Sequence, residues 1–356
     1  MIGHRHLYAS AVAQHDNLGD LILRKVGIDW LRSTGHDLHV LAEGMPEGFV
    51  DALCLSPADH VHWSKRSWLL HMARHARAEG VGLLLSAGPQ LLADNPRRLA
   101  NHALTLGVAT AVARRGATAK VGTAITGSGE RAASLESAIA RTAAVFSVRD
   151  QQTVDVLGLD QSAVFPDVAF AESFVRFYSG SLTPHEDRSI AALSFREDEA
   201  GKVESALPRI VAWCTAQRLR PVLVVQVQRD DAFARRMGAS LGVEVVGWAS
   251  GAAHGAQLTK VCEAYAQARV VVTNRLHAAI FGMVHEALPF ALEDDKRKVA
   301  RTLAPLGLED VTWTAECSVS EAAERLLRER LILARARLEE LRVALHRAMM
   351  LGPESS

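Results

Sequence analysis

Two side chains suited to chemistry, Arg275 and His277, stand where an apolar run gives way to a second apolar segment. Residues 268–272 are typical of a buried parallel strand, and residues 278–283 are typical of a helix. A guanidinium binds carboxylates and phosphates with paired hydrogen bonds, and an imidazole exchanges protons near neutral pH. Ligands of open α/β sheets bind where strands end, and helix N-termini favour anions. The segment therefore predicts an anion site.

A second polar cluster, residues 15–20, lies between the first predicted strand and the first predicted helix. Gly19 permits a tight turn at this point. Asp20 has two interpretations that the sequence leaves open. It either caps the helix or accepts a proton from a hydroxyl substrate as a general base.

Two more segments repeat the order of strand, charge and helix. In residues 147–150, Asp150 suits a helix N-cap, and Arg149 is either a surface ion-pair partner or an anion ligand. In residues 293–298, the mixed charges form either a solvated loop or a cluster that brings a lysine to the same sheet edge.

The elements that would position these residues alternate between strand-like and helix-like segments. One series runs from residue 6 to residue 157, and a second begins at residue 190. This order predicts an α/β fold with two Rossmann-like domains facing a central cleft. We expect an N-terminal domain at 1–178, a linker over 172–188, a C-terminal domain at 187–316 and a helix at 317–350.

The last segment, residues 320–350, has the periodicity of one long helix. Its apolar positions recur at spacings of four and three: Leu327, Leu331, Ala334, Leu338, Leu341 and Leu345. This stripe either packs on the body of the protein or forms a coiled-coil contact in a homodimer.

Composition narrows the class of protein. The chain has 356 residues, which favours two domains, and its forty basic and forty acidic side chains cancel, which argues against a general nucleic-acid binder. Four widely separated cysteines favour reduced thiols over a disulfide framework or zinc site, and no cluster suggests a metal. We expect no signal peptide and no membrane span, and hence a cytoplasmic protein. A position at the inner face of the cell membrane stays open.

In their order and spacing, the motifs resemble the polysaccharide pyruvyl transferase family. The resemblance rests on Asn17-x-Gly19-Asp20, Ser147-Val148-Arg149-Asp150 with Phe165-Pro166-Asp167, and Asn274-Arg275-Leu276-His277 followed by Lys298-Val299. It spans residues 15–308. One departure is at residues 86–90, where the family often has a glycine-rich turn and this chain keeps Gly88.

The resemblance implies a GT-B-like fold, similar to that of the two-Rossmann-domain glycosyltransferases. It also implies phosphoenolpyruvate as the donor, a saccharide hydroxyl pair as the acceptor, and a pyruvate ketal and phosphate as products. It assigns donor binding to Arg149, Arg275, Leu276 and Lys298, with Lys296 as the alternative lysine. Asn17, Gly19 and Gly88 are expected on the acceptor side.

The charges of these residues suggest a mechanism that uses no cofactor and no metal. His277 is the candidate acid that protonates the donor carbon, and Asp20 is the candidate base. The alternatives are a GT-B glycosyltransferase that uses a sugar nucleotide and a non-catalytic sugar- or anion-binding protein.

A lipid-linked acceptor would bring the protein to a membrane surface, and residues 60–78 combine Trp63, Trp68, basic groups and an apolar face. The segment either contacts a membrane or is an ordinary amphipathic helix. His71 and His75 are four residues apart and could bind a metal, but the sequence offers no acidic or Cys residue as a further ligand there.

Overall fold

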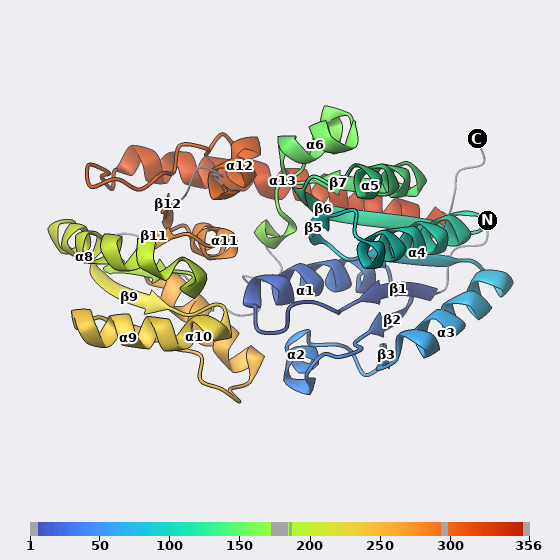
Figure 1. The fold of residues 1–356 in the computed structure, drawn as a ribbon, viewed down its shortest axis with the longest axis horizontal. Helices are drawn as coiled ribbons and strands as arrows, with labels where there is room; N and C mark the ends of the chain where they lie inside the picture. Colours follow the sequence, from blue (N-terminus) through green and yellow to red (C-terminus); the bar gives the residue numbers. More distant parts are fainter. Residues whose placement is uncertain (1–5, 172–183, 185–186, 293–297, 352–356) are drawn as a thin grey trace. The chain divides into compact units, whose positions relative to one another are not determined.

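A computed structural model describes residues 6–171, 184, 187–292 and 298–351 (Figure 1). The chain forms two compact α/β units: unit 1 comprises residues 1–13, 23–168 and 337–356, and unit 2 comprises residues 14–22 and 169–336. The sequence-based ranges placed 14–22 in the first domain, whereas the structure groups this segment with unit 2. Most of the predicted linker, 172–188, lies outside the described residues.

Unit 1 is built on a parallel sheet in the order β3-β2-β1-β4-β6-β5, with β7 also paired to β6. The strands are β1 (His6–Ser10), β2 (Asp37–Leu41), β3 (His60–His62), β4 (Val81–Leu85), β5 (Gly88–Leu92), β6 (Ala117–Gly127) and β7 (Val145–Val148). The helices between them are α1 (Leu18–Arg32), α2 (Glu47–Ala52), α3 (Lys65–Ala78), α4 (Pro96–Ala113), α5 (Glu130–Thr142) and α6 (Gln151–Leu157). The first residues of α1 belong to unit 2.

Unit 2 has a five-stranded parallel sheet in the order β10-β9-β8-β11-β12. Its strands are β8 (Ile190–Ser194), β9 (Arg220–Val224), β10 (Glu244–Val246), β11 (Ala268–Thr273) and β12 (Leu288–Ala291). Its helices are α8 (Ala200–Ala216), α9 (Asp231–Leu241), α10 (His254–Ala266), α11 (Leu276–Val284) and α12 (Lys298–Leu303). Strand order reverses between β8 and β11, so a ligand is expected at the carboxyl ends of these two strands.

The packing of α11 on β11 explains why this part of unit 2 is so apolar. Val270, Val271 and Val272 are fully buried, as expected for a central parallel strand. A Cβ atom added at Gly282 would lie 2.5 Å from Val271 Cγ1, so α11 lies directly on the strand. This close packing of α11 on β11 fixes the orientation of the first turn of α11.

The last helix, α13 (Glu321–Leu351), matches the predicted long helix, and Ser320 Oγ accepts a hydrogen bond from Ala323 N at its start. The predicted stripe from Leu327 to Leu345 is buried, with each side chain at most 2% exposed. The chain itself therefore covers the stripe. A homodimer through this helix stays a prediction and would have to use other positions.

Helix α3 contains most of the segment considered for membrane contact. Trp68 is 6% exposed and packs in a core with Tyr8, Leu41 and Met72, whereas Trp63 is 51% exposed. This is the packing of an ordinary amphipathic helix, and membrane contact stays a prediction. No helix among the described residues is long and apolar enough to cross a membrane.

Candidate functional site

The predicted anion site lies at the carboxyl edge of the unit 2 sheet. β11 ends at Thr273, Arg275 is the N-cap residue of α11, and His277 lies in the first helical turn. The Thr273 hydroxyl donates to Ser194 O at the end of β8 and accepts from Arg275 N at 2.9 Å. Thr273 thus joins the two strands at the point where strand order reverses and holds the backbone of Arg275 there.

The Arg275 side chain forms an ion pair with Asp230, which follows β9. The two side chains are 15% and 5% exposed, respectively. Asp230 also accepts a hydrogen bond from Glu197 N at 3.0 Å. Burial raises the pKa of Asp230, and the adjacent Arg275 guanidinium opposes that rise. The pair fixes Arg275 in one orientation, with 15% of its side chain exposed.

Asn274 and Arg196 extend this cluster, and the sequence analysis did not assign a role to either. Asn274 Oδ1 accepts from Arg196 N at 3.0 Å, and Asn274 Nδ2 donates to Glu199 at 2.9 Å. Arg196 follows β8 and pairs with Asp198, which raises the pKa of Arg196. Its position after a strand and before a helix repeats the pattern of Arg149, and this signal could have identified it.

Gly19 lies directly against the imidazole of His277. A Cβ atom at position 19 would be 2.2 Å from His277 Nδ1 and 2.4 Å from Cγ, far inside contact distance. The segment reaches this position because Asn17 forms an antiparallel bridge with Val227, and Leu18 N donates to Gln226 O at 3.0 Å. Asn17 and Gly19, predicted on the acceptor side, therefore lie in unit 2 with His277.

Asp20 lies in the first turn of α1 and is partly exposed. Its carboxylate accepts a hydrogen bond from Gln14 N at 3.3 Å, which closes the turn. Asn17 Oδ1, two residues before Gly19, accepts from Gly19 N at 3.0 Å. The capping contact that the sequence allowed for Asp20 is thus made by Asn17, and a role of Asp20 as general base stays a prediction.

Arg149 lies in unit 1 and is 1% exposed. Its Nη1 atom is 2.6 Å from Asp167 Oδ2, also fully buried, and its backbone N donates to Thr123 O. The next residue, Asp150, caps α6 by accepting from Thr153 N at 2.8 Å, as predicted. Arg149 therefore forms a buried ion pair that joins the end of β7 to residue 167, and its role in donor binding stays a prediction.

The remaining predicted site residues have different surroundings. Leu276 is 6% exposed and opens α11, and Lys298 is exposed at the start of α12. The alternative Lys296 lies outside the described residues. Gly88 has a φ of +107°, which favours glycine, and it begins β5.

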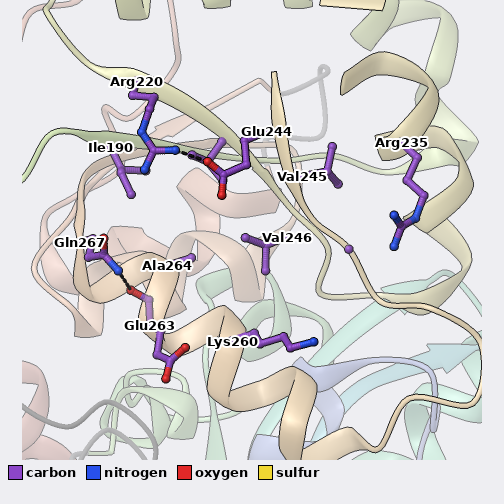
Figure 2. Close-up of a pocket in the computed structure, with 12 residues that line it drawn as sticks. Ile190, Arg220, Arg235, Glu244, Val245, Val246, Lys260, Glu263, Ala264 and Gln267 are labelled. Atoms are coloured by element: carbon purple, nitrogen blue, oxygen red, sulfur yellow. Dashed lines mark hydrogen bonds and ion pairs between the residues drawn. The ribbon is translucent and has the colours of Figure 1, made fainter. Parts of the chain in front are cut away.

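The described residues of unit 2 line open pockets that differ in their distance from the predicted motif. One, about 630 Å³, is lined partly by Gln14, His15 and Asp16 of the Gly19 segment and by Arg229 and Trp248. The other, about 420 Å³, follows edge strand β10 and α10 (Figure 2). In the second, Arg220 pairs with Glu244, and none of the residues from 273 to 277 takes part. The first pocket is the better candidate because it adjoins the predicted motif.

The middle of the chain, which contains Arg149, Asp167, Arg275 and His277, is similar to a known family. Residues 113–287 match the model of the polysaccharide pyruvyl transferase family. The match confirms the resemblance inferred from the motifs and supports pyruvyl transfer to polysaccharides in general terms. It does not extend to Asn17, Gly19, Gly88 or Lys298. No curated protein sequence matches the chain.

Solved structures share the fold of this chain at low sequence identity. A structure of S. aureus MnaA with UDP superposes with a TM-score of 0.53 at 9% identity, covering 97% of this chain and 91% of that one. A Listeria monocytogenes protein described as a UDP-N-acetylglucosamine 2-epimerase gives 0.51 at 10% identity, covering 98% and 92%. The predicted fold class, GT-B-like with two Rossmann-like units, is confirmed.

Proposed function

We propose that the chain transfers the pyruvyl group of phosphoenolpyruvate to two hydroxyls of a saccharide, forming a pyruvate ketal and releasing phosphate. The observation that carries the proposal is the arrangement at the end of β11. There a fixed, partly accessible Arg275 and an imidazole in the first turn of α11 lie at the strand-order reversal, within the segment that matches the family.

Donor binding follows from the charges at this edge. Phosphoenolpyruvate carries a carboxylate and a phosphate. The Arg275 guanidinium is paired with Asp230, and the Arg196 guanidinium is paired with Asp198 and Glu199 in the same cluster of residues. The N-terminus of α11 adds partial positive charge. Leu276 and Lys298 complete the proposed donor set of unit 2. Arg149 lies in unit 1, where it is paired with Asp167, and its role in donor binding stays a prediction.

Proton transfer starts the reaction. His277 gives a proton to the C3 methylene of the donor, so that C2 becomes electrophilic. A saccharide hydroxyl loses its proton, with Asp20 as the proposed base, and its oxygen forms a bond to C2. The C2–O bond to phosphate then breaks, and phosphate leaves with that electron pair. The second hydroxyl closes the ketal at C2 and releases its proton, and cationic side chains stabilise the departing phosphate.

The acceptor is proposed to bind in the pocket beside residues 14–16. Asp16, Gln228 and Arg229 line it and offer both donors and acceptors for sugar hydroxyls. The segment that lines this pocket continues to Gly19, which touches His277. An acceptor bound there would therefore lie on the same side of unit 2 as the proposed acid, His277. The acceptor class is a saccharide, lipid-linked or free, handled at the inner face of the cell membrane.

A combined binding and turnover assay tests this proposal. Thermal shift is measured with phosphoenolpyruvate and with UDP-, GDP- and CDP-sugars, and phosphate release is followed with a panel of saccharide acceptors. We expect stabilisation by phosphoenolpyruvate, acceptor-dependent phosphate release, and a product heavier by one pyruvate less one water.

Two results would replace the proposal with an alternative. Stabilisation by a sugar nucleotide alone, as for a protein like the UDP-bound S. aureus MnaA, would indicate a glycosyltransferase or related enzyme. Stabilisation by phosphoenolpyruvate or a saccharide without turnover of any acceptor would indicate a binding protein.

A further inference from the structure

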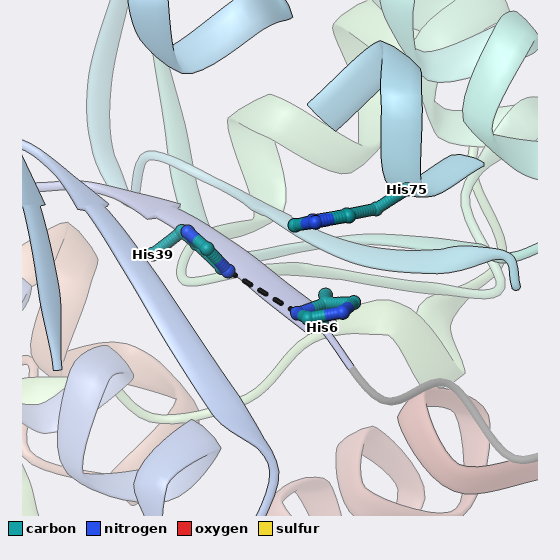
Figure 3. A group of neighbouring side chains, drawn as sticks. All are labelled: His6, His39 and His75. Atoms are coloured by element: carbon teal, nitrogen blue, oxygen red, sulfur yellow. Dashed lines mark hydrogen bonds between the residues drawn. The ribbon is translucent and has the colours of Figure 1, made fainter. Parts of the chain in front are cut away.

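A cluster of imidazoles occupies one face of the unit 1 sheet, where an apolar surface would be expected under a helix. His6 begins β1, His39 lies in β2, and His75 lies in the last turn of α3 (Figure 3). One ligand nitrogen from each of the three lies within 4.8 Å of the others. His60, His62 and His71 surround the same rings. The sequence suggested only His71 with His75, because His6 and His39 are distant along the chain.

We propose that His6, His39 and His75 form a binding site for a divalent transition-metal ion of the zinc type, which ties β1, β2 and α3 together. Neutral imidazole nitrogens are the preferred ligands of such ions, with bonds of about 2.0–2.1 Å. Two ligands on a tetrahedral ion are then about 3.3 Å apart. His39 Nε2 and His6 Nδ1 are 3.2 Å apart, which matches this spacing.

The nitrogens that face away from the proposed site have partners of the kind that orient metal ligands. Tyr8 Oη is 2.7 Å from His75 Nδ1, which leaves His75 Nε2 for the ion. His62 Nε2 is 3.1 Å from His39 Nδ1, which leaves His39 Nε2. Such outer contacts fix the tautomer and the direction of the ring.

The site also has a candidate fourth ligand and access to solvent. Asp37 Oδ2 lies 3.7 Å from His6 Nδ1, and this carboxylate, or a water, can complete four-coordination. His39 is 4% exposed, whereas the His6 side chain is 17% exposed. The His6 and His75 rings are stacked with centroids 3.6 Å apart, so coordination requires them to tilt until their lone pairs converge.

The test measures metal content and affinity on full-length protein without a polyhistidine tag. The protein is stripped with a chelator and titrated with Zn²⁺, and the bound zinc per chain is quantified. Co²⁺ then serves as a probe, because tetrahedral Co²⁺ absorbs strongly in the visible range. His75→Gln removes the ligand at the helix, and Tyr8→Phe removes only the outer hydrogen bond to His75.

The matched control is His346→Gln, which alters a partly buried histidine of the same unit that bonds to Trp30 O, outside the cluster. We expect one zinc per chain and raised thermal stability in the wild type and in His346→Gln. We expect loss of tight binding and of the Co²⁺ band in His75→Gln, and affinity about 10–100-fold weaker in Tyr8→Phe. No zinc above background in the wild type, or equal affinities in His75→Gln and His346→Gln with circular dichroism unchanged, would overturn the site.

Discussion

Residues 23–168 of unit 1 and most of unit 2 lie between Gly19 and His277 in the sequence, yet the imidazole of His277 packs directly against Gly19. No side chain fits there, since even a methyl group would lie 2.2 Å from Nδ1. Gly19 has no positive φ, so its backbone conformation would accept alanine. The glycine is therefore required by the neighbouring ring and not by the turn, and it sets the position of the proposed acid.

Gly19→Ala tests this relationship. We expect the methyl group to push the imidazole aside and to lower kcat by at least about tenfold, because small misplacements of a catalytic group are costly. Steady-state phosphate release, with thermal unfolding as a check on folding, measures the effect. The matched control is Gly107→Ala in α4, where a Cβ atom meets nothing within 4 Å. Equal kcat values for the two variants would show that the Gly19 contact does not position the acid.

Arg275→Lys tests the fixed guanidinium. A lysine keeps the charge but loses the planar fork, so we expect a higher KM for phosphoenolpyruvate with intact folding. Asp230→Asn should act in the same direction, because it removes the ion pair that orients Arg275. Kinetics at varied donor and saturating acceptor concentration provide the measurement. Unchanged KM and kcat in Arg275→Lys would remove Arg275 from the donor site.

The Arg149–Asp167 pair is expected to contribute to stability in addition to any role in donor binding. Asp167→Ala leaves a buried guanidinium without its partner and should cost about 3–5 kcal/mol in the free energy of unfolding. Urea denaturation measures this. Glu340→Ala, which breaks the exposed pair with Arg337 in the same unit, should cost at most about 1 kcal/mol. Similar losses in both variants would contradict a buried pair.

His285 predicts a pH dependence of stability. The residue is fully buried, and burial lowers its pKa to about 4 from an ordinary 6.5, although the hydrogen bond to Phe281 O opposes the shift. Below pH 6.5 this histidine is protonated in the unfolded chain, whereas in the folded chain it becomes protonated only near pH 4. Stability is therefore lost as pH falls through this window, by about 2 kcal/mol at pH 5 from this group.

His285→Asn keeps a donor for the Phe281 carbonyl and removes the titration. Denaturation of both proteins at pH 7 and pH 5 should show a smaller loss of unfolding free energy in the variant. The same loss in both proteins would mean that His285 is not the group responsible.

Local patterns predicted most of the elements, because they depend on neighbouring residues. The boundary between β11 and α11 followed from the apolar run before Thr273, and the long last helix followed from its leucine spacing. The N-cap role of Asp150 was also predicted. Strand β5 was not among the predicted elements, because residues 86–90 were considered only as a departure from the family's glycine-rich turn. Pairing with β6 makes residues 88–92 a strand.

Local sequence patterns could not predict the long-range contacts that assemble the site. Asn17 pairs with Val227, and Arg275 pairs with Asp230, across long stretches of chain that no periodicity connects. The motifs identified which residues to consider, and the fold showed that Gly19 and His277 touch. The histidine cluster was missed for the same reason, since His6, His39 and His75 come from three different elements.

The most direct test of the central claim follows the donor carbon itself. Phosphoenolpyruvate labelled with ¹³C at C2 is incubated with the protein and a saccharide acceptor, and the label is observed by NMR. We predict that the enol signal is replaced by a ketal carbon bonded to the saccharide, with one phosphate released per ketal, and that His277→Ala slows this conversion by about 10²–10⁴-fold. Absence of a ketal signal with every acceptor, or a ketal formed at the wild-type rate by His277→Ala, would contradict the account.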